Sequence, residues 1–329
     1  MTIKILFLTD DREDYLADSL LHGIRQLTGV ELIDYPRKEC LYQAKAHHSS
    51  ETLRGNGFTL YGLLEEPKKE PFRGQIWSRL EEGYFDAVIF SNIWRQWGLA
   101  LQWKSLLEKQ TLILLDGDDD ERHYPNSGSR HRLFGFGTAM RGLLGQSTTH
   151  IFKREWTKRT RFNPNSVQMH KTSFAIPEEK ILSKPLHKQN TFPIHIVDEE
   201  VADRVGGQTS YAFKLEPLYR TNLAAARFGI TCRRGGWECL RHYEIAAAGT
   251  IPCFRNLKQK PKQCAPHGLK DGYNCIAYLN ADDLLARIEI LSPEQEVAMQ
   301  HEALHWARNN STRQRALEVL QQTGLILNS

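Results

Sequence analysis

The sequence predicts an α/β protein made of two Rossmann-like domains that face one another across a cleft. Three observations lead to this fold class. The chain has 329 residues, which is about twice the usual size of one compact domain of roughly 150 residues. Continuous apolar runs alternate with amphipathic helical patterns in both halves, as in parallel sheets covered by helices on both faces. A polar stretch with prolines, residues 178–193, separates the two halves.

The first half opens with a strand, a helix and a second strand, and the alternation then continues. Each predicted strand is a short apolar run, and each predicted helix has apolar residues three or four positions apart. In order, these are strand 3–10, helix 15–27, strand 30–35, helix 74–83, strand 85–94, helix 99–109, strand 111–120, and two more polar strands within 150–156 and 167–177. Residues 36–71 show weak periodicity, which predicts loops with one or two short elements.

The second half repeats the same alternation of strands and helices. The predicted elements are helix 216–227, strand 228–232, a helix that starts near Trp237, strand 250–254, strand 274–278 and helix 281–291. Two more helices finish the chain, over 292–310 and 311–322. Ser292 and Pro293 mark the start of the first of these as the N-cap and a first-turn residue.

Composition limits the function classes. With 40% hydrophobic and 10% aromatic residues, the chain can build ordinary cores, which excludes disordered and fibrous proteins. A net charge of only +4, spread along the chain, argues against a dedicated nucleic-acid binder and leaves an anionic ligand open. The six cysteines have no metal-binding spacing. Because neither a signal peptide nor an apolar run of about 18 residues is evident, we expect a cytoplasmic protein with reduced thiols.

The segment CRRGGWECLRHYEIAAAGTIPCF, residues 232–254, places charges in an otherwise small and apolar run. A helix that starts near Trp237 and turns by about 100° per residue brings Trp237, Arg241 and Glu244 onto one face. The same spacing also suits a plain surface ion pair between Arg241 and Glu244. The sequence alone leaves both interpretations open.

Two glycines before this helix, Gly235 and Gly236, allow close approach of the backbone to a ligand. Free N–H groups and the helix dipole make such a position a favourable anion site. Three basic side chains reinforce it: Arg233, Arg234 and Arg241. A diphosphate fits this geometry, and Glu244, farther along the helix, is placed to accept hydrogen bonds from two ribose hydroxyls.

The residue pattern of this segment is similar to that of a known class of enzymes. The pattern R-x-x-E-[apolar]-x-A-x-G-x-[IV]-P resembles the C-terminal donor site of GT-B glycosyltransferases. Residues 226–254 are similar to the corresponding segment of the exostosin-like and spore-maturation CgeB-like glycosyltransferases, and the likeness extends over 216–290. The resemblance implies that Glu244 holds the ribose of the donor nucleotide and that Arg241 and Arg234 hold its diphosphate.

The implied function is transfer of a sugar from a nucleotide-sugar donor to an acceptor. Residues 1–180 would form the acceptor-side domain, residues 190–310 the donor-binding domain, and 311–329 a last helix that crosses back to the first domain. The nucleotide sugar is a co-substrate, and no further cofactor is required. The acceptor stays open among a glycan, a small molecule, a protein and a modified nucleic-acid base. Two alternatives are a non-catalytic nucleotide- or nucleotide-sugar-binding regulatory protein and a nucleotide-sugar epimerase.

An acidic loop, LLDGDDDERHYP, follows the apolar strand at 111–120, at the strand end where ligand sites of α/β proteins usually gather. Crowded carboxylates raise one another's pKa, so Asp118 or Asp119 is the candidate general base, assisted by His123 or Arg122. A divalent cation held by this loop is an alternative that we do not favour, and a solvated acidic loop is another.

Three more polar residues follow strands of the first domain: Asp10, Lys153 and Arg154. We expect Asp10 to cap a helix or line the floor of the cleft. Lys153 and Arg154 are candidates to neutralise a leaving phosphate or an anionic acceptor. An ordinary surface pair explains these two basic residues equally well.

Overall fold

The computed structural model describes residues 2–43, 53–67, 73–122, 148–157 and 168–327. Its N-terminal domain contains a six-stranded sheet with the order β2-β1-β3-β4-β5-β6, in which every pairing is parallel. The strands are β1 (Ile3–Leu8), β2 (Val30–Tyr35), β3 (Ala87–Phe90), β4 (Thr111–Asp116), β5 (Thr149–Lys153) and β6 (Gln168–Lys171). All six overlap segments that the sequence predicts as strands.

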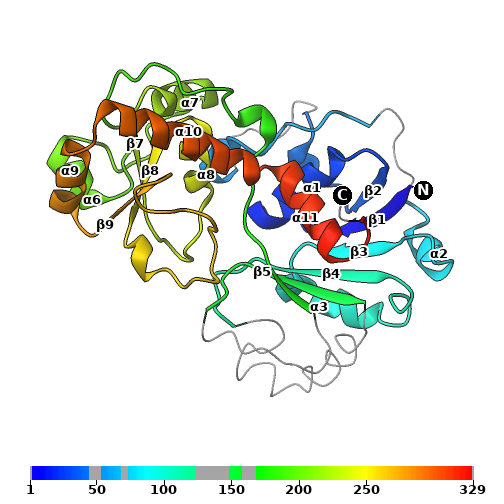
Figure 1. The fold of residues 1–329 in the computed structure, drawn as a ribbon. Helices are drawn as coiled ribbons and strands as arrows, with labels where there is room; N and C mark the ends of the chain where they lie inside the picture. The colour runs from blue at the N-terminus through cyan, green and yellow to red at the C-terminus, as the bar shows by residue number, and fades with distance from the viewer. Residues whose placement is uncertain (1, 44–52, 68–72, 123–147, 158–167, 328–329) are drawn as a thin grey trace.

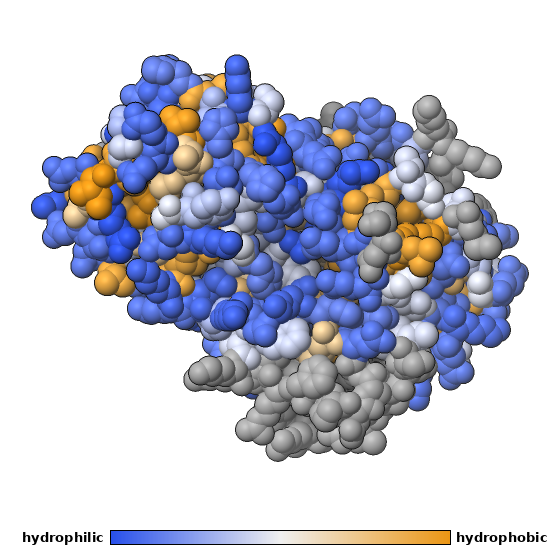
Figure 2. All heavy atoms as spheres, in the orientation of Figure 1, coloured by the Kyte–Doolittle hydropathy of each residue, from blue (hydrophilic) through white to orange (hydrophobic). Residues whose placement is uncertain are grey.

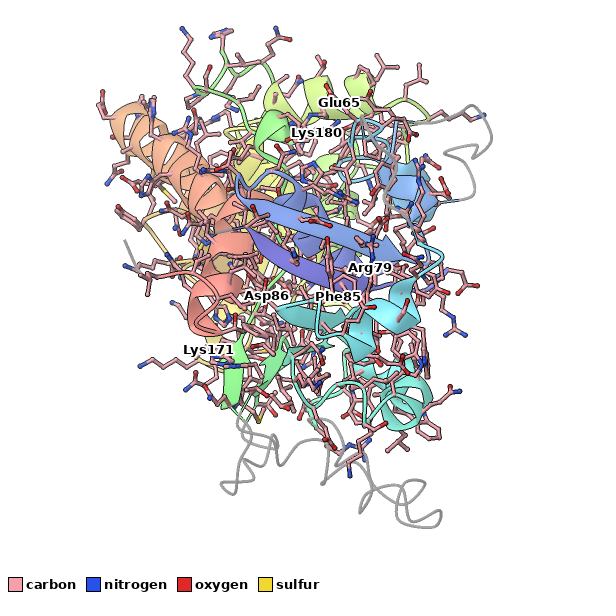
Figure 3. The ribbon with its side chains drawn as sticks, turned by 90° about the vertical axis from the view of Figure 1, so that its right-hand side faces the viewer. Glu65, Arg79, Phe85, Asp86, Lys171 and Lys180 are labelled. Carbon is pink, nitrogen blue, oxygen red and sulfur yellow. The ribbon has the colours of Figure 1, made fainter. Side chains whose placement is uncertain are left out.

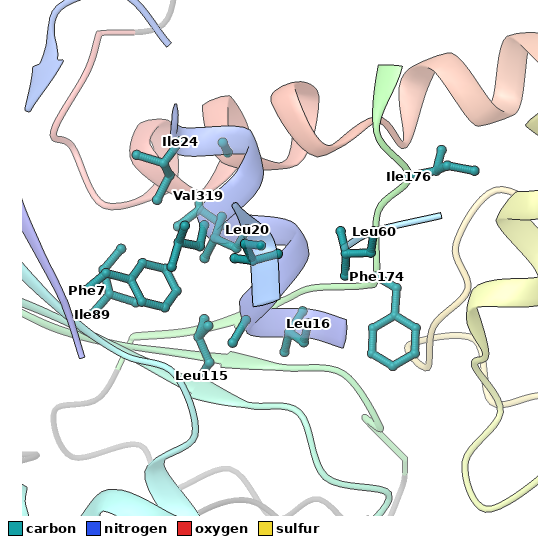
Figure 4. Packing of buried hydrophobic residues seen from close by; sticks show 14 of the residues in the cluster. Phe7, Leu16, Leu20, Ile24, Leu60, Ile89, Leu115, Phe174, Ile176 and Val319 are labelled. Carbon is teal, nitrogen blue, oxygen red and sulfur yellow. The ribbon is translucent and has the colours of Figure 1, made fainter. Parts of the chain in front are cut away.

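Helices cover both faces of this sheet. They are α1 (Tyr15–Arg25), α2 (Ile76–Glu81) and α3 (Ile93–Gln102). Alternate residues of β1 belong to different apolar clusters: Phe7 lies with Leu20 of α1 on one face (Figure 4), and Leu6 lies with Leu80 of α2 on the other. Burial of one such side chain stabilises the fold by about 1.5–3 kcal/mol. This two-sided burial explains why apolar residues occupy consecutive positions in the central strands, such as Ile5–Leu8 of β1 and all four residues of β3.

The C-terminal domain contains a smaller, three-stranded parallel sheet with the order β7-β8-β9. Its strands are β7 (Phe228–Thr231), β8 (Ile251–Arg255) and β9 (Ile276–Tyr278). Its helices are α6 (Glu199–Val205), α7 (Glu216–Ala224), α8 (Leu240–Ala247), α9 (Ala281–Glu289) and α10 (Pro293–Asn309). Short 3₁₀ turns lie at Glu39–Leu41, Arg54–Gly57, Glu178–Lys180 and Leu257–Gln259.

The last helix, α11 (Thr312–Gln322), packs on α1 of the N-terminal domain. Figure 1 shows α10 running along the C-terminal domain toward the other domain, where α11 lies beside α1. The two helices approach so closely at Gly23 that a Cβ atom there would overlap the Thr312 carbonyl group. A capping box at Ser292 starts α10 at the predicted position.

Asp18, on the buried face of α1, is a charged residue inside the N-terminal core. Only 2% of it is exposed, and it accepts a hydrogen bond of 2.9 Å from the Tyr61 hydroxyl. The Lys38 ammonium lies 3.5 Å away. Burial dominates these contacts and raises the pKa of Asp18 to about 7.

This raised pKa predicts a pH-dependent loss of stability. Because an unfolded Asp ionises near pH 4, the folded state keeps a proton that the unfolded state loses between about pH 4 and 7. The free energy of unfolding should therefore fall as the pH rises through this window, by about 2 kcal/mol between pH 5.5 and 8. Asp18→Asn should remove that component. Urea unfolding of both proteins at the two pH values measures it, and an identical pH dependence in the variant would contradict the assignment.

Candidate functional site

The basic loop between β7 and α8 forms one side of the candidate site. Helix α8 begins at Leu240, with Cys239 as its N-cap, so the prediction that it starts near Trp237 is wrong by three residues. The Trp237 backbone N–H instead donates a 2.9 Å hydrogen bond to the Glu155 carboxylate of the N-terminal domain. Cys239 has an extended backbone, with φ of −145° and ψ of 157°, so the helix cannot include the residues before it.

The two glycines of the loop lie against carboxylates of the N-terminal domain. A Cβ atom at Gly235 would overlap the Asp119 carboxylate, and one at Gly236 would overlap both Asp119 and Glu155. Only glycine permits such an approach. The groups that this backbone approaches in the structure are side chains of the other domain, and its approach to a ligand stays a prediction.

The two arginines of the loop, Arg233 and Arg234, and Arg241 in the first turn of α8 have no acidic partner. Among the described residues, no carboxylate oxygen lies within 4.0 Å of the side-chain nitrogens of Arg233, Arg234 or Arg241. The Arg233 guanidinium stacks 4.9 Å from the centre of the Trp237 ring. Arg241 is half-buried, with one nitrogen 3.3 Å from His195 Nδ1. Burial, together with the charge of Arg241, lowers the pKa of His195 to about 4, so the imidazole is neutral and adds no second cation beside Arg241.

Glu244 lies one turn farther along α8 and is buried, with 9% exposure. Its carboxylate accepts a 2.6 Å hydrogen bond from the Tyr219 hydroxyl and a 2.8 Å hydrogen bond from the Thr59 hydroxyl. Tyr219 belongs to α7, whereas Thr59 reaches it from the N-terminal domain. Since no ion pair joins Arg241 to Glu244 within 4.0 Å, the alternative of a surface ion pair is wrong.

A pocket of about 510 Å³ opens at the carboxyl ends of β7 and β8. It adjoins the basic loop, because Arg233 and Trp237 belong to its lining. The remaining lining residues are Val197, Asp198, Glu199, Glu200, Cys232, Arg255, Asn256 and Gln259. Arg255 is already paired there with Asp198 at 2.8 Å and with Glu200 at 2.7 Å, so Arg233 is the unpaired cation of this pocket.

The carboxylates of the acidic loop after β4 bind different partners. Asp118 is half-buried and accepts a 2.9 Å hydrogen bond from the Asn92 amide, which also donates to Asp14 at 3.1 Å. Asp119 forms an ion pair with Arg154. His123, the predicted assistant of the base, lies outside the described residues.

The cations expected on the acceptor or phosphate side are buried and already neutralised. Lys153 is fully buried and pairs with Asp116 at 2.9 Å. Arg154 is 2% exposed and pairs with Glu155 at 2.8 Å as well as with Asp119. Neither is a surface pair, and neither is free for an anion. The third predicted residue of this side, Asp10, receives two hydrogen bonds from Arg95, at 3.0 and 2.9 Å.

Three residues that complete the site were missed by sequence reasoning: Thr59, Glu155 and Tyr219. Thr59 falls in the weakly periodic stretch 36–71, and Glu155 directly follows the predicted cations Lys153 and Arg154. Their contacts with α8 and its loop span 185 and 82 residues. Nothing local in the sequence signals pairings of that range.

Metal ligands and membrane spans are absent from the described part of the chain. No group of three or more His, Cys, Asp or Glu side chains is arranged there to hold a metal ion. None of its helices combines the length and apolar character needed to cross a bilayer. Figure 2 shows mainly hydrophilic residues where the two domains meet, as expected for a polar ligand site.

Comparison with solved structures defines the class of fold. A glycosyltransferase from Rickettsia africae is similar over 100% of both chains, with a TM-score of 0.54 and 11% identity. HepE from Anabaena, in complex with UDP, is similar over 99% of this chain and 100% of that one, with a TM-score of 0.52 and 8% identity. Sucrose-phosphate synthase from Thermosynechococcus elongatus is similar over 98% of each chain, with a TM-score of 0.52 and 10% identity. The chain therefore has the fold of GT-B glycosyltransferases, as predicted.

No protein-family model matches the sequence, and no curated protein matches it. The narrower resemblance to the exostosin-like and CgeB-like families therefore stays a prediction.

Proposed function

We propose that this chain is a glycosyltransferase that binds a nucleotide sugar at the basic loop of its C-terminal domain. One observation carries the proposal: three arginines without acidic partners surround the start of α8, beside the buried carboxylate of Glu244. Arg241 is half-buried and the other two are exposed. Guanidinium groups form bidentate, charge-assisted hydrogen bonds with phosphate oxygens, so three of them without carboxylate partners suit a bound diphosphate. The UDP complex of HepE, a structural neighbour, supports this class of ligand.

In the proposed reaction, the protein acts mainly by positioning and electrostatics. Arg241 and the two loop arginines would stabilise the negative charge that develops on the departing diphosphate. Asp118 is the better candidate base, because Asn92 orients it without a neutralising cation. Asp119 is the weaker candidate, since Arg154 already compensates its charge. The acceptor would bind against the N-terminal domain, over residues 1–180.

Donor turnover tests the proposal directly. The protein is incubated with a panel of UDP-, GDP- and CMP-sugars, and release of free nucleotide is compared between wild type and Glu244→Ala. We expect release from at least one donor, and a loss of about tenfold or more in kcat/KM for the variant, which lacks a charge-assisted acceptor worth about 1.5–3 kcal/mol. A matched control is Glu289→Ala, at the end of α9, far from the site in sequence.

The same assay separates the two alternatives. Binding of a donor without any turnover would favour the non-catalytic regulatory protein. Conversion of one nucleotide sugar into another, with no release of nucleotide, would favour the epimerase. A panel on which no donor binds or reacts would refute the proposal.

A further inference from the structure

Residues 56–60, here called the Thr59 segment, reach from the N-terminal domain to the carboxylate that the proposed function assigns to the donor ribose. Leu60 anchors the segment in the N-terminal core, near Phe174 (Figure 4). The Asn56 amide donates a 3.0 Å hydrogen bond to a backbone carbonyl at Phe213 of the other domain. The segment thus spans the junction between the domains.

The Thr59 segment supplies Glu244 with the chemistry that a ribose would supply. The hydroxyl of threonine is a secondary alcohol, as are the 2′- and 3′-hydroxyls of ribose. Together, Thr59 and Tyr219 give the carboxylate two hydroxyl donors, at 2.8 and 2.6 Å. A ribose diol binding a carboxylate offers the same two hydrogen bonds.

The backbone of the segment is held in conformations that L residues rarely adopt. Thr59 has φ of 77° and Asn56 has φ of 56°, and a positive φ is especially unfavourable for a β-branched residue. Contacts at the junction must hold this conformation. One of them is the hydrogen bond of 3.2 Å from the Thr59 N–H to Glu216, which also binds Lys180 (labelled in Figure 3) at 2.7 Å.

The aromatic neighbours enclose the same position. Phe58 stacks on Tyr219, with ring centres 6.0 Å apart, and lies 6.2 Å from Tyr211. Phe58 is 8% exposed, whereas Tyr211 is 43% exposed. Displacement of Phe58 and Thr59 would therefore uncover both an aromatic surface and the Glu244 carboxylate.

We propose that the Thr59 segment is an autoinhibitory plug, in which the threonine hydroxyl occupies the place of a ribose hydroxyl of the donor. The inference rests on the proposed function. A nucleotide then binds only the fraction of molecules in which the segment has left Glu244. Its apparent affinity is the intrinsic affinity multiplied by that fraction.

Nucleoside diphosphate binding tests the plug. UDP, GDP, CDP and ADP are titrated calorimetrically into wild type, Thr59→Val and Asn56→Ala. Valine keeps the shape of threonine and removes the donor to Glu244, and alanine removes the anchor at Phe213. We expect at least a fivefold gain in affinity in each variant. The matched control, Thr312→Val, removes a buried threonine hydroxyl that contacts His22 instead and should leave the affinity unchanged.

Hydrogen exchange provides a readout besides affinity. Addition of the nucleotide that binds should speed amide exchange in residues 56–60 of the wild type, because the segment is displaced. Slower exchange there, or unchanged affinity in both variants, would overturn the plug. If the plug were overturned in this way but Glu244→Ala still weakened nucleotide binding, the proposed function would stand. If none of the four nucleotides bound wild type or either variant, the plug would be overturned, and the donor panel would decide the proposed function separately.

Discussion

Replacement of Arg154 by methionine is expected to lower the free energy of unfolding by about 3–5 kcal/mol, as is typical when one partner of a buried ion pair is removed. Only 2% of Arg154 is exposed, and its guanidinium faces the carboxylates of Glu155 at 2.8 Å and Glu238 at 3.9 Å. Both carboxylates are buried at the junction between the domains. Methionine fills much of the same space but removes the positive charge that faces these two carboxylates and that of Asp119. Urea unfolding at pH 8 measures the effect.

Two further measurements separate the charge effect from a loss of packing. Burial already raises the pKa of Glu238, and loss of Arg154 should raise it further. The difference in stability between wild type and the variant should therefore shrink as the pH falls from 8 to 5, because the carboxyls of the variant then become protonated. The comparison with wild type at each pH cancels the contribution of Asp18, which both proteins keep. The control Arg287→Met removes a partly exposed pair with Asp283 and should cost no more than about 0.5 kcal/mol. Equal losses relative to wild type in both variants, unchanged between pH 5 and 8, would contradict the explanation.

The strands were predictable because their burial is a local property of the sequence. Both faces of the N-terminal sheet are covered, so β1, β3 and β4 are continuous apolar runs that periodicity identifies. The start of α10 was predictable for a similar reason, since Ser292 and Pro293 act within a single turn. Such features depend on neighbours a few positions away.

The start of α8 and the partners of Glu244 depend instead on distant residues. The Trp237 N–H, in the loop before α8, is bound by Glu155, which is 82 residues away. Glu244 is bound by Thr59, 185 residues away, from a stretch with no periodic signal. The motif around Glu244 thus selects a candidate site, whereas the contacts of Glu244 with the N-terminal domain follow only from the packing of one domain against the other.

Arg241 offers the sharpest test of the proposed chemistry, because it is the half-buried member of the three unpaired arginines. For a donor that wild type turns over, Arg241→Gln should lower kcat/KM about 100-fold, which corresponds to about 2.7 kcal/mol of lost transition-state stabilisation. Glutamine can still donate a hydrogen bond, so the loss isolates the positive charge. Rapid-quench measurement of nucleotide release follows the chemical step.

The matched control for this variant is Arg227→Gln, at the opposite end of β7. Its guanidinium already binds Glu296 through hydrogen bonds of 2.9 Å, so its charge is neutralised within the protein. The kcat/KM of this variant should therefore stay within about twofold of wild type. Added salt should weaken donor binding to wild type more than to Arg241→Gln, because a charge contact with the diphosphate is screened by ions. Parallel salt curves for the two proteins, or equal losses in both variants, would show that Arg241 supports the fold rather than the diphosphate.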